Sequence, residues 1–374
     1  MNLWQRLRNN HLAIFGITVL AVLYVVVIAA DFIAPYAPYT SQLNGSLLPP
    51  TPIYLTLQDG PLKGKYIGPH VYPTSQNPTN IETGERNLSI NFHNPSPIRL
   101  FVKGNSYKLF NLNIPLPPSF KEIEIFPGIP TDIHLIGTIG AGKLNLIGTD
   151  EQGRDQVSRL LFGGRVSLFI GLIGIMISFP IGVIIGGIAG YFGGWIDTIL
   201  MRLVEVLMTI PGIYLLVALA TIIPPSLSNT KRFILIILIT SFIGWAGLAR
   251  VVRGQVLSLK DQEFVQAAKT MGASNQRIIF YHILPQTITY IIISATLTIP
   301  EFIVSESVLS LIGLGIQQPD ASWGNLLSVS TNASILVLQP WLIWPPALAI
   351  ILTVLSFNLL GDGLRDALDP NTLE

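Results

Sequence analysis

Two glutamates lie within a long apolar stretch of the sequence, where a charged side chain is unusual. Glu301 follows Pro300, and Glu306 stands further along the same stretch. Ionising a carboxyl group in hydrocarbon costs several kcal/mol unless water or a partner compensates, so both acids are candidates for lining a path through a membrane and attracting a cation. Glu306 could instead cap a broken helix or pair within its own chain. The sequence leaves both interpretations open.

A glycine-rich segment offers a second kind of chemistry. Residues 137–143 match a phosphate-binding loop up to its final position, where Leu144 replaces the serine or threonine that would hold Mg²⁺. We interpret this match as accidental and expect no nucleotide there. The five histidines are scattered without ligand spacing, the chain has no cysteine, and no nucleophile–base pair is evident. We therefore expect no catalytic residues, no metal and no cofactor, and a protein that is not an enzyme.

Composition places the chain in a membrane. Of its 374 residues, 50% are hydrophobic and only 11% are charged, about half the charged fraction of a typical soluble domain. The mean hydropathy is +0.56, and the apolar residues are gathered into long blocks. A formal net charge of +1 gives no support for nucleic-acid binding. The chain is therefore predicted to be a polytopic protein of the lipid bilayer.

Six apolar spans are expected, at about residues 12–33, 167–191, 199–223, 233–248, 287–314 and 341–360. The first span competes with a secretory signal, but it is long for one and ends without a small-x-small cleavage site. Six spans place both termini on one side, and basic residues are more frequent on that side. The positive-inside tendency then predicts that both termini are cytoplasmic.

The character of the sequence changes between the first two spans. Residues 35–147 are punctuated by proline, asparagine and glycine around short β-prone runs, at 53–57, 88–92, 98–103 and 133–136. A structureless loop of this length would be unusual. We expect three domains: a tail with the first transmembrane helix (1–34), a β-rich extracytoplasmic insertion (35–147), and a core with five transmembrane helices (148–374).

Four glycines in the second span recur at four-residue spacing. Gly182, Gly186, Gly190 and Gly194 would share one helix face, and such a face lets another helix pack closely against the backbone. The partner could be a helix of the same chain or of a second subunit, and the sequence does not decide between them.

The segment 261–285, between the fourth and fifth spans, is predicted to form a helix, a glycine turn and a second helix. Asp261 suits the N-cap, and Glu263 adds favourable negative charge to that end. Phe264, Ala268 and Met271 recur at helical spacing and form a narrow apolar stripe.

The second half of this segment follows from similar rules. Gly272 can adopt the left-handed conformation that ends a helix, Ser274 can cap the next one, and Pro285 is expected to stop it. The small Ala267 and Ala268 would let another surface approach. Such an amphipathic hairpin suits docking into a partner's groove, although an ordinary loop of a polytopic protein is the alternative.

The hairpin resembles the EAA loop in permease subunits of bacterial ABC importers, whose pattern is Glu-Ala-Ala, then Gly, then Leu-Pro. The corresponding residues are Gln266, Ala267, Ala268, Gly272, Leu284 and Pro285, with Gln266 replacing the usual glutamate. Residues 148–168 and 357–370 resemble the C-type permease of dipeptide, oligopeptide and nickel importers, as does the ExxLSxLGLG-like stretch that contains Glu306. Within the first of these, Arg159 and Arg165 are expected to contact lipid headgroups.

The resemblance implies an all-α fold of six transmembrane helices, like a type I ABC importer permease. It implies a subunit that forms half of the translocation path in the bacterial inner membrane. A homologous second permease, two ATP-binding cassette ATPase subunits and an extracytoplasmic substrate-binding protein are the implied partners, and the ATPases would hydrolyse ATP. The residues that would receive ATPase motion are Asp261, Glu263, Phe264, Gln266, Ala267, Ala268, Met271, Gly272, Leu284 and Pro285.

Two other classes of function stay open. An ion-coupled secondary transporter or channel would need no ATPase partner, but inverted repeats and paired intramembrane charges are not evident. A membrane-anchored binding module would place the function in the insertion. Within the importer class, peptides are favoured as substrate, while nickel, glutathione and oligosaccharides remain alternatives.

Overall fold

The computed structural model describes residues 3–77, 87–110, 112–116, 121–224 and 226–368. The chain divides into two compact units. We call residues 1–21, 168–309 and 351–374 the helical unit, and residues 22–167 and 310–350 the mixed unit. The units interleave along the chain, whereas the three expected domains follow one another in sequence.

The structure is mostly helical, as predicted, with five or six apolar helices of membrane-spanning length among the described residues. Five are long enough alone: α2 (His11–Ile28), α4 (Gln156–Phe192), α7 (Asn229–Leu259), α10 (Ile288–Leu311) and α13 (Trp344–Leu368). The predicted third span consists of α5 (Gly194–Thr209) and α6 (Gly212–Thr221), which meet at an angle of 84°. The bend follows from Pro211, because the residue before a proline avoids helical angles and Ile210 is extended.

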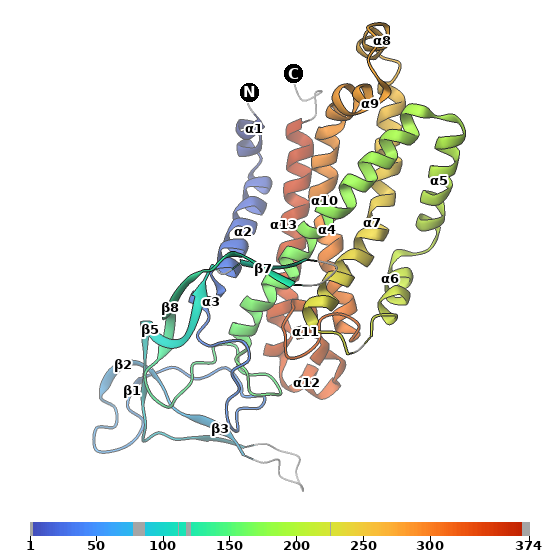
Figure 1. Ribbon diagram of the computed structural model, residues 1–374. Coiled ribbons are helices and arrows are strands. Elements are labelled where there is room, and N and C mark those ends of the chain that lie inside the picture. Colours follow the sequence, from blue (N-terminus) through green and yellow to red (C-terminus); the bar gives the residue numbers. More distant parts are fainter. Residues whose placement is uncertain (1–2, 78–86, 111, 117–120, 225, 369–374) are drawn as a thin grey trace. The chain divides into compact units, whose positions relative to one another are not determined.

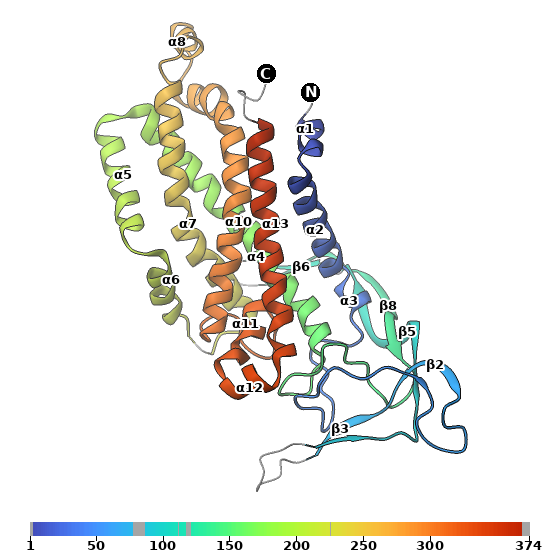
Figure 2. The same ribbon diagram turned by 180° about the vertical axis from the view of Figure 1, so that it is seen from behind.

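Close backbone approaches order the helices of the helical unit. A side chain at Gly16 of α2 would meet Ser356 of α13, and one at Gly361 of α13 would meet Leu297 of α10. A side chain at Gly171 of α4 would meet Ile299 of α10. The series α2, α13, α10, α4 therefore packs through a glycine at each crossing; Figures 1 and 2 show these helices from opposite sides.

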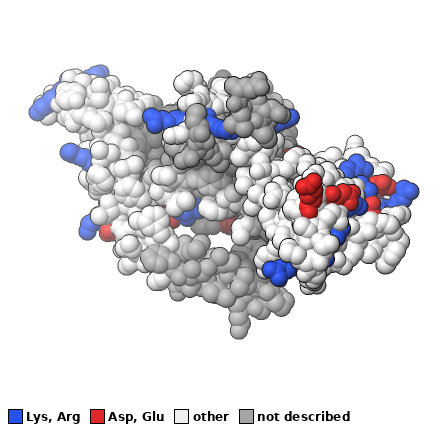
Figure 3. Space-filling model, turned by 90° about the horizontal axis from the view of Figure 1, so that it is seen from above, with Lys and Arg blue, Asp and Glu red and all other residues white. Residues whose placement is uncertain are grey.

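One end of the helical unit carries α1, the end of α13 and the predicted hairpin (Figures 1 and 2). Leu7 of α1 and Ala13 pack with Ala367 of α13 in a small buried cluster, and the Arg6 guanidinium donates to the Ala367 carbonyl. Seen from this end, charged side chains form small scattered groups on a mostly uncharged surface (Figure 3). The shorter helices are α1 (Leu3–Asn9), α3 (Ala30–Ile33), α8 (Glu263–Thr270), α9 (Asn275–Arg277), α11 (Trp323–Leu327) and α12 (Ala333–Leu338).

The mixed unit contains all eight described strands: β1 (Tyr54–Thr56), β2 (Tyr66–Val71), β3 (Thr74–Gln76), β4 (Leu88–Ile90), β5 (Ser96–Leu109), β6 (Leu112–Leu116), β7 (Lys121–Phe126) and β8 (Ile129–Thr138). Four form an antiparallel sheet in the order β1-β2-β5-β8, while β3 pairs with β4 and β6 with β7. Each of the four predicted β-prone runs contains or overlaps a strand. The β-rich character predicted for this segment is therefore present.

Buried histidines tie this β-rich part together. His134 of β8 is 4% exposed, and its ring is hydrogen-bonded to the carbonyls of Ala34 and Asn105. His70 of β2 is 1% exposed and contacts the Gly68 carbonyl and the Tyr72 hydroxyl. Both rings are thus occupied by local hydrogen bonds, which accounts for these two histidines structurally.

Candidate functional site

The predicted hairpin forms at the end of α7. Helix α8 spans Glu263–Thr270, and its buried residues are Val265 and Ala268. Both belong to an apolar cluster with Val256 of α7 and with Ile279 and Ile283 beyond the turn. The hairpin is therefore seated on its own subunit by an apolar face at i, i+3 spacing.

The predicted stripe of Phe264, Ala268 and Met271 is not the buried face. Phe264 is 41% exposed and Met271 is 80% exposed, and Ala267 is exposed between them. Val265, the residue after Phe264, faces the apolar cluster instead and belongs to the buried side of α8. The hairpin thus has two sides: one packed against α7, and one that presents apolar side chains outward.

Asp261 does not cap α8 as predicted. The helix begins at Glu263, its N-cap is Gln262, and no side chain makes the capping hydrogen bond. Helix α7 continues to Leu259, so the Lys260–Gln262 turn occupies the place where Asp261 was expected to act. Glu263 does lie in the first turn of α8, where negative charge is favourable.

Gln266 has a definite structural role. Its side-chain amide donates to the Lys260 carbonyl at 3.3 Å and so satisfies a backbone group at the end of α7. An ionised glutamate accepts hydrogen bonds but has none to donate. Glutamine in place of the family's usual glutamate therefore provides an internal hydrogen bond that a carboxylate could not donate.

The turn after α8 follows the predicted chemistry, but the second helix does not end where expected. Gly272 has a φ of +80°, and the Ser274 hydroxyl accepts from the Arg277 backbone N–H. After α9 the chain forms a π-helical turn (Ile278–Ile283) and a 3-10 turn (Leu284–Thr287), then continues into α10. The wider turn accommodates Pro285, which lacks an N–H for a regular helix. Leu284 is buried, whereas Pro285 is exposed.

The end of α4 contacts both halves of the hairpin. The Tyr191 hydroxyl donates to the Asn275 side-chain oxygen at 3.0 Å, and the Lys269 ammonium group lies 5.6 Å from the centre of the Tyr191 ring. The hairpin therefore contacts α4 as well as α7.

Of the four glycines at four-residue spacing, three face α7 of the same chain. A side chain at Gly182 would meet the Trp245 carbonyl, one at Gly186 the Ala249 carbonyl, and one at Gly190 the Arg253 carbonyl. Gly194 lies elsewhere: α4 ends at Phe192, and nothing lies within 4 Å of a side chain added at Gly194. Sequence reasoning extended the helical period past the real end of the helix.

An ion pair that the sequence did not suggest joins α5 to α7. The Arg253 guanidinium donates from Nε and Nη2 to the two carboxylate oxygens of Asp197, each at 2.5 Å. A bidentate pair of this kind fixes geometry as well as charge. In the sequence, the only local sign that Asp197 has a structural role is its position near a glycine-rich helix start, directly after a span.

The two candidate path acids differ in exposure. Glu306 is 0% exposed, so it is enclosed within the chain. Glu301, one and a half turns earlier in α10, is exposed and lines a pocket with residues of α6 and α7. The structure therefore does not bring the two carboxylates into one site.

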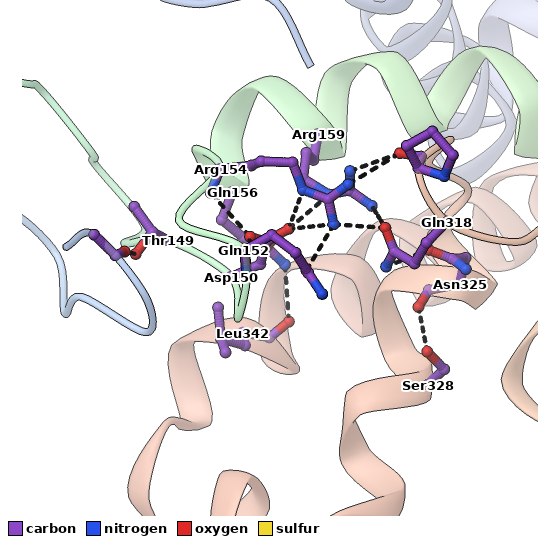
Figure 4. Close-up of polar contacts among 12 residues, drawn as sticks. Thr149, Asp150, Gln152, Arg154, Gln156, Arg159, Gln318, Asn325, Ser328 and Leu342 are labelled. Atoms are coloured by element: carbon purple, nitrogen blue, oxygen red, sulfur yellow. Dashed lines mark hydrogen bonds and ion pairs between the residues drawn. The ribbon is translucent and has the colours of Figure 1, made fainter. Parts of the chain in front are cut away.

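A buried polar network lies in the mixed unit, at the start of α4 (Figure 4). The Asp150 carboxylate accepts from Arg154 Nε at 2.7 Å and lies 3.2 Å from Arg159 Nε. Both guanidinium groups also donate to the Gln318 side-chain oxygen and to the Pro319 carbonyl. Gln318 in turn donates to Asn325 of α11 at 3.2 Å.

The expectation that Arg159 contacts lipid headgroups is wrong, whereas the Arg165 side chain is 34% exposed. The Arg159 side chain is fully buried in this network. Arg165 donates to the Val27 and Ile28 carbonyls and pairs with Asp31 at 2.5 Å. Internal acceptors are therefore close enough to satisfy both guanidinium groups.

The phosphate-loop-like segment lacks the context of a nucleotide site. Its first residues end β8, and the next helix, α4, begins at Gln156, beyond the loop rather than directly at it. The Gly142 N–H donates to the Ser96 hydroxyl, and the Lys143 ammonium lies 4.8 Å from the Tyr36 ring centre. No group of three or more potential metal ligands occurs in the described residues.

Comparison with known proteins agrees with these features. Residues 182–374 match the family described as binding-protein-dependent transport system inner membrane component, and residues 2–50 match the N-terminal transmembrane domain of oligopeptide transport permease C. The first range contains the hairpin and both candidate acids, whereas every strand of the described residues lies outside both ranges.

Curated relatives are similar over most of their own length. The chain is 48% identical to the dipeptide transport system permease protein DppC of Bacillus subtilis (strain 168), over 60% of this chain and 68% of that protein. It is 44% identical to the oligopeptide transport system permease protein OppC of Haemophilus influenzae, over 60% and 70%. It is 41% identical to the glutathione transport system permease protein GsiD of Pectobacterium atrosepticum, over 62% and 74%. The chain therefore belongs to the family of inner membrane components of binding-protein-dependent transport systems.

Proposed function

We propose that the chain is the C-type permease subunit of an ABC importer for dipeptides or oligopeptides in a bacterial inner membrane. The names of its relatives support this substrate class, with glutathione as a chemically related alternative. A homologous second permease would complete the path, two ATPase subunits would supply energy, and a substrate-binding protein would deliver peptide. The chain itself performs no catalysis in this proposal.

The proposal that ATPase motion enters the chain through residues 261–285 rests on the two sides of the hairpin. Its inner side is fixed by Val265 and Ala268, while Phe264, Ala267 and Met271 stand exposed. Apolar side chains exposed together on a surface favour a protein partner. The buried side would pass the partner's movement to α7, and Tyr191 would pass it to α4.

The orientation in the membrane is part of this proposal. The end of the helical unit that carries the hairpin also carries α1 and the end of α13 (Figure 1). If the ATPases bind the hairpin, both termini are cytoplasmic, and the β-rich segment between α2 and α4 lies on the extracytoplasmic side. The proposed domains remain 1–34, 35–147 and 148–374.

The adjacent alanines Ala267 and Ala268 provide a matched test. Ala267→Asp places a charge on the exposed side, so the subunit should fold and insert while ATPase association is lost. Ala268→Asp buries an unpaired carboxylate in the apolar cluster, so the subunit itself should be destabilised by about 3–5 kcal/mol. Co-purification of the ATPases in mild detergent and thermal unfolding of the isolated subunit separate the two effects.

Normal ATPase association and peptide uptake with Ala267→Asp would reject the coupling role. A wild-type subunit that takes up solute without any ATPase partner would reject the importer proposal itself and favour an ion-coupled transporter.

A further inference from the structure

A small pocket opens on the helical unit between α6, α7 and α10. Its volume is about 200 Å³, and its polar lining consists of Glu301, Thr240, Thr298 and Ser305. Leu216 and Phe302 supply apolar walls. A pocket of this size holds the end group of a larger molecule rather than a whole peptide.

Two of the three hydroxyl groups in this pocket, those of Thr240 and Thr298, can only accept hydrogen bonds from a ligand. Thr240 Oγ1 donates to the Ile236 carbonyl at 2.8 Å, and Thr298 Oγ1 donates to the Ser294 carbonyl at 2.8 Å. A hydroxyl has one hydrogen to donate, so only oxygen lone pairs of these two threonines remain for a ligand. Together with the Glu301 carboxylate, the pocket offers negative charge and acceptors.

Among the described residues, Glu301 forms neither an ion pair nor a hydrogen bond, and its side chain is exposed. A carboxylate facing lipid in the middle of a span would be costly. The face formed by α6, α7 and α10 therefore adjoins water or a compensating cation, which is what a substrate passage supplies.

The ligand chemistry follows from this lining. An ammonium group has three N–H donors and no acceptor, which complements one carboxylate and the two threonine oxygens. The apolar walls suit the carbon atoms next to the ammonium group. An anionic group would meet repulsion from Glu301 and find no hydroxyl hydrogen on Thr240 or Thr298.

We propose that this pocket binds the α-ammonium group of a peptide in transit, with Glu301 as its counter-charge. This inference rests on the proposed peptide-import function and adds a specificity-determining residue to it.

Uptake by reconstituted complexes tests the role of the charge. The substrates are alanylalanine and propionylalanine, which differ only in the ammonium group, each presented with the binding protein. Glu301→Gln should lower alanylalanine uptake about tenfold, the value of one charge-assisted hydrogen bond, and leave propionylalanine uptake unchanged. Glu301→Asp should restore part of the loss. Glu151→Gln, an exposed acid in the mixed unit, serves as the control for charge alone.

A second measurement does not depend on delivery by the binding protein. The chain has no cysteine, so Ser305→Cys places a single thiol of this chain in the pocket. Alanylalanine should slow its reaction with a cationic methanethiosulfonate, propionylalanine should not, and the protection should disappear in the Ser305→Cys, Glu301→Gln double variant.

Equal protection by both compounds, or protection by neither, would overturn the inference. Loss of the assembled complex in Glu301→Gln would also overturn the inference. The carboxylate would then serve to pair with a basic residue of the second permease, not with a ligand. A wild-type complex that takes up no peptide would instead reject the proposed function, so the two failures are distinguishable.

Discussion

Two connecting regions of this chain are held by opposite kinds of force. The loop before α4 together with the first turn of that helix, which we call the motif loop (Gly148–Arg159), is fixed by the buried charges of Asp150, Arg154 and Arg159. The hairpin at 261–285 is fixed by apolar side chains and has only exposed charges. Buried charges tolerate little displacement without losing their partners, whereas apolar contacts are non-directional. The motif loop is thus held in one geometry by directional bonds, whereas the hairpin is held by contacts without a fixed direction.

The strongest test of this contrast removes the carboxylate that, among the described residues, pairs with both arginines of the network. Asp150→Asn deprives two buried guanidinium groups of their shared counter-charge, since Arg154 is 5% exposed and Arg159 is 0% exposed at the side chain. We expect the unfolding free energy to fall by about 3–5 kcal/mol, measured by denaturant unfolding of the detergent-solubilised subunit. The exposed neighbour variant Glu151→Gln should behave as wild type. A loss for Asp150→Asn no larger than that of the control would show that the network is not under charge constraint.

The corresponding change in the hairpin is apolar. Val265→Ala removes two buried methyl-sized groups from the cluster, and we expect a loss of about 2 kcal/mol. Phe264→Ala removes a larger side chain from the exposed side and should cost less in the isolated subunit. The same unfolding assay measures both, and the contrast fails if Phe264→Ala proves the more damaging change.

The stability of the motif loop should also depend on pH. Burial raises the pKa of the Asp155 carboxyl from 3.8 to about 7, opposed by hydrogen bonds from Ser158 and assisted by the nearby Asp150 charge. The native state then binds a proton that the unfolded state releases, so this stability is complete below about pH 4 and is lost as pH rises through about 7. Between about pH 6 and about pH 8 the fall is about 1.4 kcal/mol.

Asp155→Asn should abolish this component of the pH profile, because the amide does not titrate. Unfolding of wild type and variant at matched pH values measures it. Parallel profiles for the two proteins would exclude Asp155 as the titrating group.

The smallest effect is expected at the hairpin turn. Gly272 has a left-handed φ of +80° with no atom within 4 Å of an added side chain, so Gly272→Ala carries only backbone strain of about 1 kcal/mol. Gly247, within α7, also has open space around it but a helical conformation, and Gly247→Ala should be neutral or slightly stabilising. Opposite signs for these two variants, measured by the unfolding assay, would confirm the turn geometry; equal signs would contradict it.

Much of the fold was predictable because it follows from local rules. Apolar blocks predicted the spans, β-prone runs predicted strands, and Gly272 and Ser274 predicted the turn. At Gly194, Asp261 and Pro285 the sequence misplaced the ends of helices, and elsewhere its periodicity did not reveal what lies opposite. Phe264 and Val265 are adjacent and both apolar, and only the position of α7 decides which is buried.

The same limit applies to the charged residues. Arg159 and Arg165 look like interfacial arginines until Gln318 and Asp31 are placed beside them, and no local pattern links residues so far apart in sequence. The pocket at Glu301 was missed for the same reason, since its threonines belong to different helices. Glu301 itself was found because an acid in an apolar stretch is a signal that needs no partner.

The direction in which the hairpin points depends on the number of residues in the π-helical turn at Ile278–Ile283. A π turn holds one residue more than an α turn, and each residue of an α-helix rotates the chain by about 100°. Deleting one residue here would turn the preceding part of the hairpin, residues 261–277, by about 100° about the axis of α10 while leaving the sequence of that part unchanged. Insertions and deletions in this turn are therefore a route by which descendants of one permease could come to fit differently placed ATPases.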